Sequence, residues 1–212
     1  GLLATTAPPA EIKALIMDCG CQAYLANFNA PDQTVVGGKL IALEQLATAL
    51  KAKSYPARIL SVPAAFHTPL MAGSSRLLQQ ALEAGTLNPP QTAFISTVDN
   101  QQVTDVARIK RNLGVQLTTP VKYAPLIEAL SQEMPTVFIE VGPQQTLTKL
   151  NRKILSADAN TIAIDNPKRS GLETLLGVQA LLECLGVGES PNVSAANAST
   201  SSIPNPATPQ GA

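Results

Sequence analysis

The segment QAYLANFNAPDQTVVG, residues 22–37, predicts two strands joined by a turn at Ala30-Pro31-Asp32. A helical pattern lies on each side of this pair. Residues 8–20 begin with two prolines, carry apolar side chains on one face and end at a glycine, which favours a helix before the first strand. Apolar residues recur with helical spacing over residues 40–50, which predicts a second helix after the second strand.

Short apolar runs lie outside both helices, at residues 2–5 and 57–62. The predicted order is therefore strand, helix, strand, strand, helix, strand. This order is typical of a ferredoxin-like arrangement, in which an antiparallel sheet carries two helices on one face. We assign it to residues 1–62 as a small subdomain.

Strands and helices alternate in the second half of the chain, which favours a parallel α/β sheet covered by helices. The apolar character of these strands indicates burial on both faces, although so few strands do not complete a sheet by themselves. The strands are expected at residues 93–98, 136–141 and 161–164, and the helices at residues 69–84, 103–117, 123–134, 147–154 and 172–185.

The composition changes at about Gly188 to Ser, Pro, Asn, Ala and Thr, and Glu189 is the only charged residue that follows. Such a segment buries too little apolar surface to order itself, so residues 188–212 are expected to be a disordered linker. A frayed tail without a role is the alternative.

Charge and aromatic content exclude several classes of function. Fifteen basic and fifteen acidic residues balance, so no overall field attracts nucleic acid or an anionic membrane. The chain has no Trp, three Tyr and four Phe, and it has no apolar stretch long enough to span a bilayer. We therefore expect neither a nucleic-acid nor a membrane partner.

Cysteine usage points to a reducing compartment. Cys19, Cys21 and Cys184 form an odd set, and a single histidine cannot complete a zinc site with them. We expect no metal, three reduced thiols and a cytoplasmic protein.

The only histidine, His67, lies in the segment VPAAFHTPLM, residues 62–71, between an expected strand and an expected helix. Pro69 suits the first helical position, and the Thr68 hydroxyl is placed to cap the first turn. A neutral imidazole at the end of a strand suits a general base. The local sequence alone favours the alternative, a surface or packing histidine.

Four segments follow one another along the chain: LANFNAP with QTVVGG (25–31 and 33–38), AFHTPLM (65–71), QLTTPVKY (116–123) and FIEVGP (138–143). In this order and spacing they resemble the acyltransferase family that loads malonyl units onto acyl carrier proteins, including acyltransferase domains of iterative polyketide and polyunsaturated-fatty-acid synthases. The resemblance extends from Gly1 to about Leu185.

The resemblance implies an α/β hydrolase-like body with a ferredoxin-like insert, residues 63–187 being the C-terminal part of that body. It also implies a serine–histidine pair that transfers malonyl from CoA to the phosphopantetheine arm of a carrier protein in a ping-pong exchange. His67 matches the family's general base, and the backbone carbonyl of Thr119 matches the group that orients its ring. No cofactor is implied.

Two further residues match substrate positions of the family. Phe66 resembles the aromatic residue of malonyl-selective members, in which a ring fills the space of an α-methyl group. Asn29 matches an asparagine near the acyl or pantetheine group. Core packing for Phe66 and a turn-holding role for Asn29 are the alternatives. Ala64 and Gln144 depart from the family's usual histidine and glycine.

The family's nucleophile motif, Gly-x-Ser-x-Gly, does not occur in the sequence. We expect the serine in the N-terminal part of the same acyltransferase, which would then be a partner of this chain along with the carrier protein and adjacent synthase domains. A non-catalytic docking or scaffold fragment of a synthase is the alternative, and a stand-alone ferredoxin-like ligand-binding domain is a third.

Five basic residues gather around the last expected strand: Lys149, Arg152, Lys153, Lys168 and Arg169. An acidic carrier protein could dock on such a patch. The alternative is a solvated helix face.

Overall fold

The structure is a computed structural model, and it describes residues 1–187. The linker expected at residues 188–212 lies outside the described residues. The chain divides into two compact units. The first holds Gly1–Thr136 and Lys149–Ala159, and the second holds Val137–Thr148 and the described residues from Asn160 onward. The division expected after residue 62 does not coincide with these units and stays a prediction.

The N-terminal part of the first unit is a four-stranded antiparallel sheet in the order β2-β3-β1-β4. The predicted order of strands and helices is confirmed, except that the last strand ends at Leu60 rather than at Val62. Gly20 ends the first helix in the left-handed conformation, with φ of 60°. The elements are β1 (Leu2–Thr5), α1 (Pro9–Cys19), β2 (Ala23–Ala30), β3 (Gln33–Gly38), α2 (Leu40–Ala52) and β4 (Ala57–Leu60).

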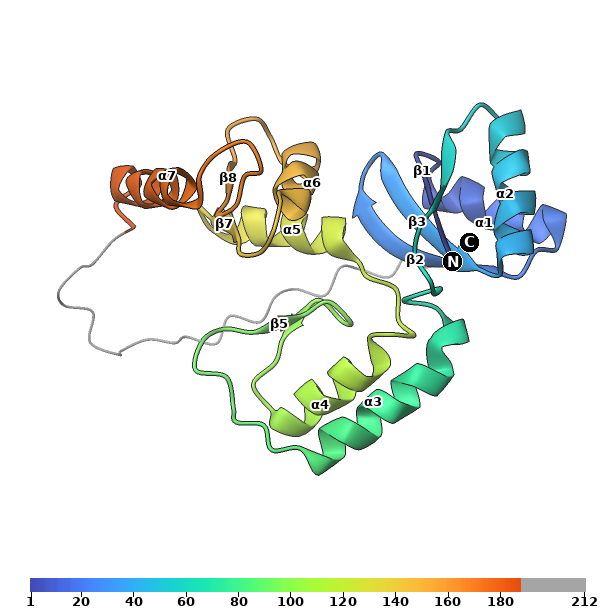
Figure 1. Cartoon of the computed structure of the whole chain (residues 1–212), viewed down its shortest axis with the longest axis horizontal. Coiled ribbons are helices and arrows are strands. Elements are labelled where there is room, and N and C mark those ends of the chain that lie inside the picture. Colours follow the sequence, from blue (N-terminus) through green and yellow to red (C-terminus); the bar gives the residue numbers. More distant parts are fainter. Residues whose placement is uncertain (188–212) are drawn as a thin grey trace. The chain divides into compact units, whose positions relative to one another are not determined.

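Helices α1 and α2 pack on the same face of this sheet (Figure 1). In the register, Leu3 of β1 lies opposite Val36 of β3, and the side chains of both are buried against the two helices. The opposite face carries a smaller apolar cluster around Leu2, Ala26 and Val35. The main core includes Leu3, Ile12, Leu15, Cys21, Val36, Leu43, Leu46 and Leu50.

Two helices, α3 and α4, pair in the remainder of the first unit (Figure 1). The buried Ser75 hydroxyl of α3 donates a hydrogen bond of 2.6 Å to the carbonyl of Gly114 in α4. The Asp105 side chain accepts from the Arg108 N–H, so α4 begins after Asp105 rather than at Val103. The elements are a 3₁₀ turn η1 (Pro69–Met71), α3 (Ala72–Ala84), β5 (Ile95–Ser96), β6 (Gln101–Gln102), α4 (Val106–Val115) and α5 (Tyr123–Glu133).

The prediction of a long strand at residues 93–98 is wrong. Only Ile95–Ser96 is a strand, and it pairs antiparallel with Gln101–Gln102. The chain reverses within residues 97–100, because the Asn100 N–H donates to the Ser96 carbonyl and Asn100 adopts a positive φ of 55°. A hairpin therefore replaces the expected strand of a parallel sheet.

The second unit contains the parallel strand pair that the alternating pattern predicts. Ile139 lies opposite Ile162, and a capping box between Ser170 and Glu173 begins the last helix. The elements are β7 (Val137–Glu140), α6 (Thr146–Ile154), β8 (Asn160–Ala163) and α7 (Gly171–Cys184), and α6 continues into the first unit. Among residues 1–187, no helix is long and apolar enough to cross a membrane.

Candidate active site

His67 lies in the loop between β4 and η1, and its backbone has a positive φ of 62°. A positive φ is uncommon for a residue with a side chain, and it persists only where the surroundings hold it. Here the neighbouring Thr68 is fully buried, and its hydroxyl donates a hydrogen bond of 2.7 Å to the Ala65 carbonyl. The expected helix cap by Thr68 is therefore wrong, because the hydroxyl closes the loop behind His67 instead.

The imidazole of His67 is held through its Nδ1, which lies 2.8 Å from the carbonyl oxygen of Gln116. A carbonyl oxygen only accepts hydrogen bonds, so Nδ1 carries the proton in this contact. In the neutral ring, the lone pair is then on Nε2. The ring is fixed in the tautomer that a general base needs.

The carbonyl at His67 belongs to Gln116, not to Thr119 as expected. Gln116 is the C-terminal cap of α4, where the last carbonyls have no partner within the helix. Thr119 turns back toward the helix: its N–H donates to the Gln116 carbonyl at 3.4 Å, and its hydroxyl donates to Val115. Nothing in the sequence signals Gln116 as the partner, because every residue type has a backbone carbonyl.

The segment after α4 is also fixed to the edge of the first sheet. The Val121 N–H donates to the Ala26 carbonyl, and the Phe28 N–H donates to the Val121 carbonyl, both at 2.9 Å. These two bonds add a parallel bridge beside β2. The segment that orients His67 is therefore anchored at two places, and His67 is held close to this sheet.

A cavity of about 440 Å³ lies at this place. Its walls come from α1, from the start of β2, from His67 with the first residue of η1, and from the segment after α4. Most of the lining is apolar, which suits the body of an organic ligand with a few polar groups at the reacting end. The lining residues are Lys13, Ile16, Met17, Ala23, Tyr24, Leu25, His67, Pro69, Thr118 and Pro120.

Of the four residues expected at the site, only His67 lines this cavity. Thr119 lies between two lining residues, Thr118 and Pro120. Phe66 is half-buried in the loop of His67, and Asn29 is half-buried near the end of β2. The roles expected of Phe66 and Asn29 stay predictions.

A close backbone approach that the sequence analysis missed supports the His67 loop. A Cβ atom on Gly37 of β3 would lie 2.5 Å from Thr68 Cγ2 and 3.5 Å from Ala65 Cβ. Only glycine lets this loop pack against β3 without a shift. Gly37 belongs to the QTVVGG segment, whose pattern indicated a strand but not the reason for its glycine.

Glu140, in the FIEVGP segment, has a structural role in the second unit. Its carboxylate accepts hydrogen bonds from the backbone N–H groups of Leu147 and Thr148, at 3.0 and 2.7 Å, in the first turn of α6. Burial raises the pKa of Glu140, but the bonds from Thr148 and Leu147 outweigh it and leave the pKa below its ordinary value. The segment thus joins the end of β7 to the start of the next helix.

The expected basic cluster does not form one surface in a single unit. Lys149, Arg152 and Lys153 belong to the first unit, whereas Lys168 and Arg169 belong to the second. Lys153 also forms an ion pair with Asp32, at 2.8 Å.

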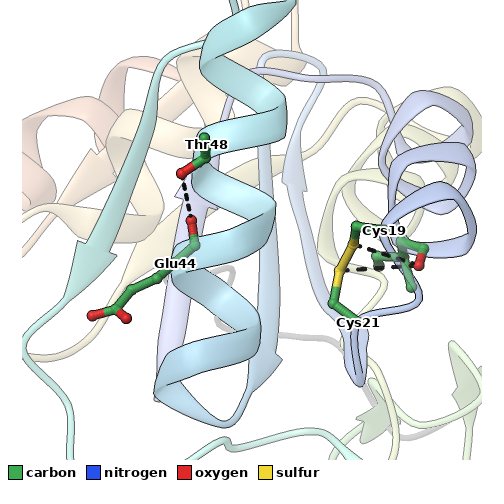
Figure 2. Close-up of a disulfide and its surroundings, with 5 residues drawn as sticks. Cys19, Cys21, Glu44 and Thr48 are labelled. Atoms are coloured by element: carbon green, nitrogen blue, oxygen red, sulfur yellow. Dashed lines mark hydrogen bonds between the residues drawn. A yellow bond between two sulfur atoms is a disulfide. The ribbon is translucent and has the colours of Figure 1, made fainter.

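The expectation of three reduced thiols is wrong for two cysteines. Cys19 and Cys21 form a disulfide at the end of α1 (Figure 2). Cys184 is free and exposed. Spacing gave no indication of this bond, since a single residue separates the two cysteines. Within residues 1–187, no group of three or more His, Cys, Asp or Glu side chains is placed to hold a metal ion.

Fold and site together define a mixed α/β protein that presents one oriented histidine in a largely apolar cavity. The family description "Acyl transferase domain" matches residues 3–180, so the chain belongs to the acyl transferase domain family. This confirms the resemblance to malonyl transacylases and to synthase acyltransferase domains.

The relatives include a transacylase and a much longer hybrid synthetase. The chain is 34% identical to the malonyl CoA-acyl carrier protein transacylase of Bacillus subtilis over 175 residues, which are 82% of this chain and 53% of the relative. It is 26% identical to a PKS-NRPS hybrid synthetase of Aspergillus candidus over 194 residues, which are 90% of this chain and 8% of that protein.

Solved structures agree with this assignment. The malonyl CoA-acyl carrier protein transacylase of Clostridium perfringens superposes with a TM-score of 0.78 at 25% identity, covering 89% of this chain and 60% of the other. The acyltransferase domain of the second module of the salinomycin polyketide synthase gives a TM-score of 0.77 at 25% identity and covers 88% and 44%. The chain spans about half the length of the curated transacylases that it matches.

Proposed function

We propose that this chain is the histidine-bearing part of an enzyme that transfers malonyl groups from CoA to the phosphopantetheine arm of an acyl carrier protein. The hydrogen bond between His67 Nδ1 and the Gln116 carbonyl carries this proposal, because it leaves Nε2 as a base at the cavity. The malonyl CoA-acyl carrier protein transacylases among the relatives support the choice of donor and acceptor.

The proposed reaction has two half-reactions through one serine ester. In the first, His67 Nε2 takes the proton of a serine hydroxyl while the serine oxygen attacks the malonyl thioester, and the protonated ring then returns that proton to the CoA thiolate that leaves. In the second, Nε2 takes the proton of the pantetheine thiol, whose sulfur attacks the serine ester and becomes the new malonyl thioester. The bond to the serine oxygen breaks, and the protonated ring returns the proton to that oxygen. The Gln116 carbonyl holds the ring in place throughout, and it supplies no carboxylate charge.

The serine is proposed to come from a segment outside the printed sequence, which contains no Gly-x-Ser-x-Gly. This segment would be the N-terminal part of the same α/β hydrolase-like acyltransferase. Residues 1–62 would then be its ferredoxin-like subdomain, and residues 63–187 the C-terminal part of its core. The order β2-β3-β1-β4 and the helices on one face support the first of these assignments.

Phe66 and Asn29 are proposed to contact substrate, Phe66 by filling the space that an α-methyl group would need and Asn29 by hydrogen bonding. Neither Phe66 nor Asn29 lines the cavity of this chain. Both contacts would therefore form only when substrate or the serine-bearing segment is bound. We propose no cofactor beyond the substrates, a cytoplasmic location, and adjacent synthase domains as neighbours.

Denaturing intact-mass spectrometry of the protein isolated from its source, before and after incubation with malonyl-CoA, tests the proposal. One malonyl group gained by a polypeptide with the Gly-x-Ser-x-Gly motif, and lost on adding phosphopantetheinylated carrier protein, is the expected result. The gain should disappear in the His67→Asn variant. An adduct on a serine or cysteine of residues 1–212 would overturn the serine–histidine assignment. No adduct at all would favour the non-catalytic docking role.

A further inference from the structure

The disulfide between Cys19 and Cys21 occupies the corner between α1 and β2 (Figure 2). Cys19 is the last residue of α1, Gly20 turns the chain with a φ of 60°, and Cys21 lies two residues before β2 begins. The bond joins cysteines separated by a single residue, so the ring that it closes is very short. Because short rings restrict the unfolded chain less than long ones, global stabilisation is a weak reason for this bond.

The two cysteines differ in their exposure. Cys19 is exposed, whereas Cys21 is 7% exposed and belongs to the main core, together with Ile12 and Leu15 of α1. Thiol–disulfide exchange requires an incoming thiolate to reach one sulfur while the other sulfur leaves. The geometry therefore makes Cys19 the sulfur that an outside thiol attacks and Cys21 the leaving group.

The same corner forms part of the cavity that holds His67. Ile16 and Met17, just before the disulfide, and Ala23 and Tyr24, just after it, line that cavity. Both sulfurs also lie near the carbonyl of Ile16, Cys19 Sγ at 3.6 Å and Cys21 Sγ at 4.0 Å. Any change in the bond between the sulfurs thus occurs between two stretches of the cavity wall.

We propose that Cys19 and Cys21 form a reversible thiol–disulfide site, which exchanges with a small thiol of the glutathione class and alters the cavity wall beside it. This goes beyond the acyl transfer proposed above. A disulfide in a cytoplasmic protein is usually transient and responsive to redox conditions, which agrees with the proposed location.

The exchange is balanced by two molecules of the small thiol. The first thiolate attacks Cys19 Sγ, forms a mixed disulfide there and releases the Cys21 thiolate. The second attacks the sulfur of the bound small molecule, which leaves as its disulfide, and releases the Cys19 thiolate. Two small thiols are oxidised while one protein disulfide is reduced. Oxidation by the small disulfide runs through the same steps in reverse.

Cysteine alkylation after equilibration in glutathione buffers of increasing reducing power, read by intact mass, tests the site. At the oxidising end only the free Cys184 should be labelled, and at the reducing end all three cysteines, so two labels appear together in one transition. The Cys184→Ser variant should keep that transition with one label fewer. The Cys21→Ser variant should lose it. Three labels in every buffer, or one label even at the reducing end, would overturn reversible pairing.

Hydrogen exchange of residues 13–25 tests the effect on the cavity wall without any enzymatic assay. Reduction should speed exchange there and leave α3 unchanged, and the Cys19→Ser/Cys21→Ser double variant should match the reduced chain. Equal exchange in both states would overturn the coupling. Neither readout depends on malonyl transfer, so this inference and the proposed function fail independently.

Discussion

The methyl group of Thr68 occupies the space in which a side chain at Gly37 would begin. A Cβ on Gly37 would lie 2.5 Å from Thr68 Cγ2 and 3.1 Å from Leu2 Cδ2. Thr68 cannot move freely, because it is fully buried and its hydroxyl is bonded to Ala65. This contact fixes the residue after His67 against β3.

Gly37→Ala should therefore lower the free energy of unfolding by about 1–3 kcal/mol, the usual cost of overpacking a tight interior. Urea unfolding of the two proteins measures the difference.

The Thr68→Ser substitution supplies the matched control, since it removes the clashing methyl group and keeps the hydroxyl. In the Gly37→Ala/Thr68→Ser double variant, the two effects should not add, and part of the lost stability should return. Strict additivity would show that the methyl contact is not the reason for the glycine.

His67→Asn separates orientation from base chemistry. The Asn amide can donate to the Gln116 carbonyl as Nδ1 does, and asparagine tolerates the positive φ at this position, but it has no basic nitrogen in place of Nε2. Under the proposed function, malonyl transfer should fall about 10²–10⁴-fold, while urea unfolding stays near that of the parent.

Gln116→Ala is the companion variant, because it keeps the backbone carbonyl and removes only the side chain. Its transfer rate should remain close to that of the parent. A His67→Asn enzyme of comparable rate, or a large loss in Gln116→Ala, would contradict the assigned roles.

The sequence predicted those parts of the fold that local periodicity determines. The strands and helices of residues 2–60 were visible because apolar spacing and the glycine at residue 20 mark them, and the pair β7 and β8 followed from the alternating pattern. The prediction of a strand at residues 93–98 was wrong, because the hydrogen bond from the Asn100 N–H to the Ser96 carbonyl reverses the chain after only two paired residues.

The site was only partly predictable, because its contacts come from distant or featureless groups. His67 carries a distinctive side chain, but its partner is a backbone carbonyl 49 positions away, which no residue type signals. The bond between Cys19 and Cys21 depends on a left-handed glycine turn that brings their Cα atoms to 5.3 Å.

Asp99 should make the stability of the first unit sensitive to acid. Burial raises the pKa of Asp99, but hydrogen bonds from Arg108, at 2.7 Å, and Asn112, at 3.3 Å, outweigh it, and the pKa is below its ordinary value. Since the folded state then binds protons less readily than the unfolded state, this contribution is complete above the unfolded pKa. It is lost as the pH falls through the folded pKa.

Urea midpoints measured from neutral pH down through the aspartate range should therefore fall less steeply for Asp99→Asn than for the parent. Asp158→Asn, at an exposed position, is the control and should keep the parent's slope. Equal slopes for the Asp99→Asn variant and the parent would remove Asp99 from the causes of acid sensitivity.

Gln144 is strained in a way that a single substitution should relieve. Its backbone has a φ of 69°, in the left-handed region that costs a residue with a Cβ roughly 1–2 kcal/mol. Its backbone N–H donates 2.6 Å to Asp165, a bond that glycine would keep. Gln144→Gly should therefore raise the free energy of unfolding by about 1 kcal/mol, because the relief exceeds the entropy that glycine gains in the unfolded chain. The control is Gln145→Gly, because Gln145 is the next residue and has no positive φ. This variant should give no such gain in stability. Thermal melts of both variants and the parent therefore distinguish strain relief from a general effect of added glycine.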